Sequence, residues 1–89
     1  MSEAIAEMPR YQSHKIVHAL KIQKMEEPLP SGHCLLHPAE VGYKPIFVGP
    51  DWMSRCHATA KDHGYYVVYE DGYTSWSPTK AFEDGYTRI

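Results

Sequence analysis

The residues with the most evident chemical capacity are cysteines and histidines in the middle of the chain. Zinc in proteins takes four Cys or His ligands in a tetrahedron, and Cys34-x-x-His37 has the spacing of half such a site. The second half of a zinc site is missing, because neither the adjacent pair Cys56-His57 nor the longer Cys56–His63 interval has the usual ligand spacing. In addition, Cys34 and His37 are three residues apart, and on a strand their side chains would point to opposite faces. We expect structural cysteines and no cofactor. The metal-ligand candidates are Cys34, His37, Cys56 and His63.

A cysteine nucleophile is the second chemistry that these residue types allow. Cys56 would need a histidine to take its proton, with His57, His63 and His18 available. Neighbouring residues on a helix do not face each other, so His57 could not activate Cys56 there. No segment resembles an oxyanion hole or a nucleophile turn. The sequence therefore predicts a protein without enzymatic activity.

Aromatic residues are concentrated in the C-terminal third of the chain. One face of a hairpin there must pack on the core, and the aromatics of its other face should remain exposed. Tyr and Trp are enriched at protein interfaces because they combine apolar area with a polar group and few rotors. They also stack on nucleobases, but only Lys80 and Arg88 lie close to them in the sequence. The predicted interaction surface is Tyr65, Tyr66, Tyr69, Tyr73, Trp76 and Tyr86.

These aromatics flank Asp71-Gly72, the strongest hairpin signal in the sequence. A two-residue type I′ turn would place Tyr65, Val67 and Tyr69 on one face with Thr74 and Trp76. A three-residue loop, Glu70-Asp71-Gly72, would instead place Tyr66 and Val68 with Thr74 and Trp76. Both closures need Gly72 at positive φ, which costs glycine little.

The N-terminal half predicts further strands. From Tyr11 to Met25 the chain alternates, with His14, Ile16, His18, Leu20 and Ile22 on one face, which favours one long strand. The i, i+4 spacing of Ile16, Leu20 and Lys24 leaves a helix as the alternative. Short strands are predicted over residues 33–37 and 45–48, and Pro45 at the beginning of the second indicates either a sheet edge or a strand start.

Two helices and a last strand complete the predicted elements. The first helix is capped by Gly49 or Asp51 and stops before Gly64, with an apolar stripe of Trp52, Met53, Cys56 and Ala60. The second covers residues 79–84, with Ser77 as N-cap and Pro78 at its first position. Residues 86–89 form a short final strand. The predicted fold is α+β: a small antiparallel β-sheet with a hairpin in its C-terminal half and one or two short helices.

Length and charge limit the possible functions. Eighty-nine residues make one small domain, assigned to residues 11–89, with residues 1–10 as a flexible tail. Eleven acidic and nine basic residues give a formal charge of −2, which disfavours a nucleic-acid partner. No apolar run approaches the ~20 residues that span a bilayer, so no membrane partner is expected. The acidic N-terminus lacks a secretory apolar region, which predicts a cytoplasmic protein with reduced thiols.

Three segments resemble small uncharacterised proteins encoded by phages and prophages. The most specific is GYYVVYEDGYTSWSPTKAFEDGYT, residues 64–87, and residues 11–22 and 42–48 are similar to the beginning and middle of the same proteins. The resemblance covers about half of the chain and carries no catalytic or binding residue with it. It implies an accessory protein that acts in the host cytoplasm.

Together these observations predict a phage or prophage accessory protein that acts as a non-enzymatic protein-interaction module. The blocking of a host factor is what the resemblance implies for it, by analogy with phage accessory proteins of this size. Its expected partner is a host protein or a second copy of itself, because the aromatics exceed what one small core can bury. The alternative is a small-ligand protein that holds a nucleotide-like molecule in an aromatic and His-lined pocket.

Overall fold

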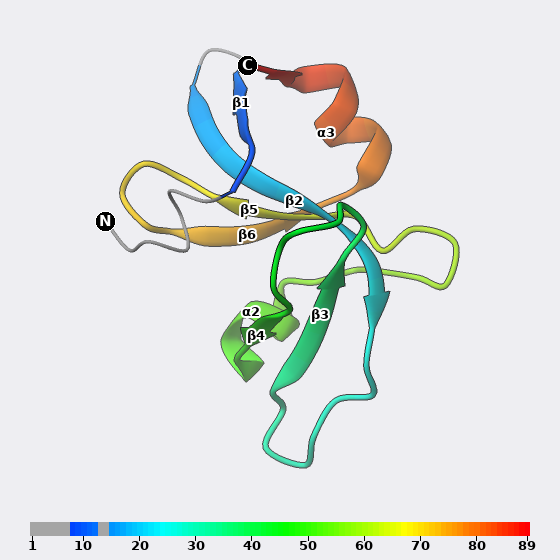
Figure 1. Ribbon diagram of the computed structural model, residues 1–89. Coiled ribbons are helices and arrows are strands. Elements are labelled where there is room, and N and C mark those ends of the chain that lie inside the picture. Colours follow the sequence, from blue (N-terminus) through cyan, green and yellow to red (C-terminus); the bar gives the residue numbers. More distant parts are fainter. Residues whose placement is uncertain (1–7, 13–14) are drawn as a thin grey trace.

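The computed structural model of this chain describes residues 8–12 and 15–89 (Figure 1). Most of the predicted tail, and His14 of the first predicted strand, lie outside these residues. The described part is an α+β fold, as predicted, but it is mostly sheet: seven strands and two short helices. The strands are β1 Arg10–Gln12, β2 Ile16–Met25, β3 Cys34–Pro38, β4 Ile46–Val48, β5 Tyr65–Val68, β6 Thr74–Ser77 and β7 Thr87–Arg88, and the helices are α2 Pro50–Ser54 and α3 Thr79–Gly85.

The long, curved strand β2 is the central strand of the sheet and pairs with three other strands (Figure 1). Its beginning pairs with β1, its middle with β5 and its end with β3, all antiparallel. The prediction of a single strand from Tyr11 to Met25 is wrong, because the chain folds back on itself and places Tyr11 opposite Val17. This fold-back brings the ring of Tyr11 to 4.8 Å from that of Phe82, a contact that a straight strand would forgo.

The buried face of β2 changes halfway along the strand. Val17 and Ala19 are fully buried on one face, and Leu20 and Ile22 are buried on the other. The predicted Leu20/Ile22 row is therefore confirmed, but it describes only the second half of the strand. Two core clusters result: one with Val17, Ala19, Tyr65, Val67 and Phe82, the other with Ile22, Cys34, Leu36, Val48 and Trp52.

The β5–β6 hairpin closes with the three-residue loop. Tyr66 lies opposite Trp76, and the Tyr69 N–H donates to the Tyr73 carbonyl at 2.8 Å. Gly72 takes a φ of +89° in this loop, where glycine avoids a steric cost that other residues carry. The hairpin packs on both sides, since Tyr65 and Val67 belong to the first cluster while Tyr66 and Trp76 contact the second. The expectation that one hairpin face stays exposed is therefore wrong.

Helix α2 is much shorter than predicted. It covers only Pro50–Ser54, with Gly49 as N-cap, and buries Trp52 against the second cluster. The chain then leaves the helix, and Thr59 and Asp62 exchange backbone hydrogen bonds of 2.9 and 3.1 Å in a tight turn. Polar side chains that bond to nearby backbone compete with helix continuation. Ala60 lies in this exposed turn, so it forms no part of an apolar helical stripe.

The other short elements lie close to their predicted ranges. β3 and the edge strand β4 match residues 33–37 and 45–48 to within one residue. β7 pairs with β1 at the other limit of the sheet, which confirms the final strand. Helix α3 presses Phe82 onto Tyr65, with ring centroids 4.2 Å apart, and this stack holds the helix on the first cluster.

Candidate interaction surface at the hairpin tip

The structure divides the six predicted interface aromatics among three places. Tyr65 is only 4% exposed and stacks, like the half-buried Tyr86, on Phe82. Tyr66 and Trp76 are half-buried beside the second cluster. Tyr69 and Tyr73 lie together at the tip of the β5–β6 hairpin, with Tyr73 51% exposed. The six residues therefore do not form one continuous patch, and Tyr73 is the most accessible of them, whereas Tyr69 is half-buried against the first cluster.

The tip pair borders an open cleft of ≈ 750 Å³ between the β5–β6 turn and the neighbouring β1 and β2 ends. The Tyr69 and Tyr73 ring centroids are 6.0 Å apart and tilted by 35°. The described residues that line the cleft are Gln12, Lys15, Ile16, Tyr69, Glu70, Asp71 and Tyr73. Sequence reasoning missed Lys15, Ile16 and the two acidic turn residues, because only the folded sheet brings residues 12–16 beside residues 69–73.

The positive and negative charges of this cleft lie on different walls. Lys15 precedes β2, whereas Glu70 and Asp71 lie in the hairpin turn on the other side. In the described part of the chain, none of the three forms an ion pair within 4.0 Å. Asp71 also accepts a 2.9 Å hydrogen bond from the Tyr73 N–H, which fixes the backbone on which that ring stands. The cleft therefore offers an apolar centre between one cationic wall and one anionic wall.

Arg55 holds Tyr73 from a second direction. Its guanidinium carbon lies 5.2 Å from the centre of the Tyr73 ring, within the range of a cation–π contact. The same guanidinium donates to the Thr74 carbonyl at 3.0 Å and to the Asp51 carboxylate at 2.9 Å. These bonds join the α2 end to the hairpin. They orient an exposed tyrosine before any partner arrives, which lowers the entropy lost on binding.

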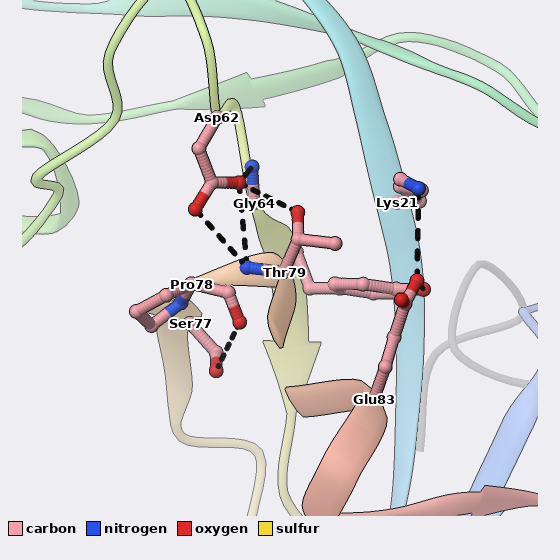
Figure 2. Close-up of polar contacts among 8 residues, drawn as sticks. Lys21, Asp62, Gly64, Ser77, Pro78, Thr79 and Glu83 are labelled. Atoms are coloured by element: carbon pink, nitrogen blue, oxygen red, sulfur yellow. Dashed lines mark hydrogen bonds and ion pairs between the residues drawn. The ribbon is translucent and has the colours of Figure 1, made fainter. Parts of the chain in front are cut away.

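Asp62 makes the densest polar junction in the described chain, shown in Figure 2. Its carboxylate accepts the Thr79 hydroxyl at 2.6 Å, the Thr79 N–H at 3.3 Å and the Gly64 N–H at 3.0 Å. It therefore caps α3 from a distant loop, and the predicted Ser77 cap is wrong: Ser77 ends β6 and Pro78 is the N-cap residue. The bonds from Thr79 are the main reason that the pKa of Asp62 lies below its ordinary value.

A polar groove of ≈ 550 Å³ runs beside this junction, and most of its charged side chains pair with one another. Lys21 lies 3.6 Å from the Glu83 carboxylate, and Lys80 lies 2.8 Å from that of Asp84 (the Lys21 contact is drawn in Figure 2). The buried Tyr65 hydroxyl donates to Glu83 at 2.7 Å. Burial, followed by this hydrogen bond, raises the pKa of Tyr65, so its hydroxyl stays protonated. The Lys21 and Tyr65 contacts with Glu83 fasten α3 to the sheet, whereas the Lys80–Asp84 pair lies within α3.

The cysteine and histidine candidates are dispersed. Within residues 8–12 and 15–89, no group of three or more His, Cys, Asp or Glu side chains is placed to hold a metal ion. The buried Cys34 thiol donates to the Glu26 carbonyl at 3.1 Å, and His37 contacts the Glu26 carboxylate at 2.6 Å. The His63 carbonyl accepts the Trp76 indole N–H. Burial raises the pKa of the Cys34 thiol, which disfavours the thiolate that a metal would need.

The structure shows no hydrogen bond between the Cys56 thiol and a described histidine. The thiol packs against the second core cluster, and burial raises its pKa. The His57 ring instead faces the edge of Trp76, with centroids 6.2 Å apart. A thiol kept protonated without a neighbouring base is a poor nucleophile.

Comparison with known proteins found no matching family model, curated protein or solved structure. Among the described residues, no helix has the length and apolar character needed to cross a membrane. The chemistry of the hairpin tip is therefore the basis for inferring function.

Proposed function

We propose that this chain is a small non-enzymatic protein-interaction module whose binding surface is the tip cleft, the space lined by residues 12, 15, 16, 69–71 and 73. The observation that carries the proposal is the half-exposed Tyr73, held by Arg55 and Asp71 over an open cleft whose charged side chains form no ion pair with any residue that the structure describes. An oriented tyrosine with adjacent unpaired charges combines an apolar anchor with polar groups that select a partner. Of the predicted aromatics, the proposal retains Tyr69 and Tyr73 as the contact residues.

The biological setting of the proposal comes from the resemblance to phage and prophage proteins. Such accessory proteins of this size act in the host cytoplasm by binding and blocking a host factor, and this role is proposed here by analogy. The surface supports a protein partner, whether a host protein or another copy of the chain. The small-ligand alternative gains no specific support from the described residues, because those that line the tip cleft include tyrosines but no histidine, and those that line the groove with His63 include no Tyr, Trp or Phe.

Site-specific photo-crosslinking tests whether proteins bind at the tip. A photoreactive benzoylphenylalanine replaces Tyr73 in one variant and Lys24, at the far end of β2, in a control variant. Both variants are expressed in bacterial cells and irradiated, and adducts are separated by size and identified by mass spectrometry. A discrete protein adduct is expected from position 73 and not from position 24, because only position 73 lines the cleft.

Equal adduct patterns at the two positions, or no adduct at position 73, would remove the tip cleft as a protein-binding surface. An adduct with a host protein and an adduct with the chain itself both support the proposed function. They differ in mass, so the same experiment reports which of the two partners is bound.

A further inference from the structure

We propose that the tip cleft binds the tip cleft of a second copy of this chain, across a twofold axis. This inference rests on the proposed function, because it names the partner bound at the same surface. A partner must place a negative group against the Lys15 wall, a positive group against the Glu70 and Asp71 wall, and apolar atoms against the centre. A twofold contact presents each surface to itself, so such an interface must be self-complementary.

The charges of the cleft meet that condition. Lys15 stands on one wall, and Glu70 and Asp71 stand on the other, with no ion pair to any described residue. A purely cationic guest would be repelled by Lys15, and a purely anionic guest would be repelled by the two carboxylates. A second copy turned by 180° places Lys15 of each chain opposite the acidic turn of the other. Complementary charges of this kind fix orientation and suppress wrong partners.

The apolar centre supplies the contact area. Ile16 is half-buried, and Tyr69 and Tyr73 lie beside it with their rings 6.0 Å apart. Tyr73 is the most exposed of the hairpin aromatics, at 51%. In a twofold contact the two Tyr73 rings approach the axis, where residues of this type contribute most to binding. Arg55 and Asp71 already hold each ring in place.

The sheet edge at β4 is less suited to self-association. The edge strand β4 has only three residues, and Pro45 and Pro50 stand close to its two ends. Short edges with prolines prevent another strand from adding to a sheet. The exposed Phe47 of β4 is covered on one side by the stacked ring of His33, 5.1 Å away. The tip cleft is therefore better suited than the β4 edge to hold a second copy.

A charge-swap experiment tests the twofold contact. Light scattering after gel filtration should give a dimer mass for the unchanged chain at about 100 µM. Lys15→Glu places like charges opposite each other at both ends of the contact, and the double variant Glu70→Lys, Asp71→Asn does the same with the other sign. The amide introduced by Asp71→Asn keeps an acceptor for the Tyr73 N–H. Each variant alone should show an average mass shifted toward the monomer, with its Kd raised about tenfold or more.

Mixing the two variants is the decisive step. In the mixed pair, the carboxylate introduced by Lys15→Glu faces the ammonium introduced by Glu70→Lys. At the other end of the contact, the Lys15 retained by the double variant faces the unchanged acidic turn, so a heterodimer mass should return. Lys24→Glu and Glu27→Lys are matched controls, because both residues are exposed and lie outside the cleft, and they should leave the dimer intact. Circular dichroism verifies that every variant is folded, and Tyr73→Ser should also shift the average mass toward the monomer.

A monomer mass for the unchanged chain at that concentration overturns this inference. So does a mixture of the two charge variants that stays monomeric while each is folded. In either case a host adduct at position 73 would leave the proposed function standing, whereas the absence of any adduct would remove both.

Discussion

At the scale of single residues, Asp62 and Gly72 have the clearest structural roles. Asp62 connects the loop after α2 to the first turn of α3 through Thr79, and it also accepts the Gly64 N–H. Gly72 supplies the positive φ that closes the hairpin on three residues. Both lie in segments without regular structure, where one side chain or one dihedral angle decides how distant elements meet.

Removing the Asp62 carboxylate should destabilise the fold in a pH-dependent way. Asp62→Ala is expected to lower the free energy of unfolding by about 1–2 kcal/mol at pH 7, because the Thr79 and Gly64 donors lose their acceptor. The folded-state pKa of Asp62 lies below its unfolded value. Its charged form therefore stabilises the fold above about pH 4, and this contribution is lost as the pH falls through the folded pKa.

Urea unfolding at pH 7 and pH 3 measures this difference. The gap between the unchanged chain and Asp62→Ala should be smaller at pH 3. Asp84→Ala is the control, because it removes only an exposed i, i+4 pair with Lys80 and should change stability by less than about 0.5 kcal/mol. An equal gap at both pH values would show that the charge of Asp62 does not stabilise the junction.

Adding a side chain at Gly72 should strain the hairpin turn. A Cβ there would meet no atom within 4 Å, so the cost of Gly72→Ala comes from its φ of +89° alone and should be about 1 kcal/mol. Gly85→Ala, which also meets no atom but needs no positive φ, is the control and should be neutral or stabilising. Thermal melting distinguishes them. Equal melting temperatures for Gly72→Ala and the unchanged chain would argue against this turn geometry.

At the scale of elements, β2 explains how so short a chain builds a core. The strand buries a different apolar face in each half. Val17 and Ala19 pack in the cluster beneath α3, and Ile22 packs in the cluster that contains Trp52 of α2. Figure 1 shows α3 beside the first half of the strand, and α2 beside β4 and below β5 and β6. Each helix is too short to be stable by itself, so each depends on one large buried side chain, Phe82 or Trp52.

Truncating Phe82 should therefore unfold α3 from the sheet. Phe82 is 1% exposed and contacts the rings of Tyr11, Tyr65 and Tyr86. Phe82→Ala should lower the free energy of unfolding by about 3–5 kcal/mol. The chain offers a matched control in Phe47, which is 58% exposed, and Phe47→Ala should cost much less. Denaturant midpoints decide between them, and similar losses for the two variants would contradict the assigned core.

At the scale of the whole molecule, stability should not depend on a metal ion. The thiols of Cys34 and Cys56 are buried in or against one apolar cluster, and burial raises the pKa of both. Treatment with a strong chelator should leave the melting temperature unchanged, since a structural zinc domain unfolds on losing its ion. Elemental analysis of the purified chain is the companion measurement. Stoichiometric zinc combined with unfolding by chelator would overturn this expectation.

The sequence by itself determined the local elements that depend on neighbouring residues. Asp71-Gly72 set the hairpin, Pro45 marked the start of β4, and the alternation around Leu20 marked β2, because turn chemistry and side-chain period act over a few residues. The residue at which an element ends was harder to predict from the sequence. The helix predicted up to Gly64 ended at Ser54, since the polar bonds of Thr59 and Asp62 favoured a turn.

Only the tertiary structure decided which residues meet. The fold-back of residues 10–25 into β1 and β2 brings Lys15 and Ile16 to the tip of a hairpin more than fifty residues away in the chain. Asp62, not Ser77, caps α3 for the same reason. Both hairpin faces are covered because β2 reverses its buried side, which no pattern within the hairpin could indicate. Contacts between distant segments depend on the packing of the whole chain, and local sequence patterns do not encode them.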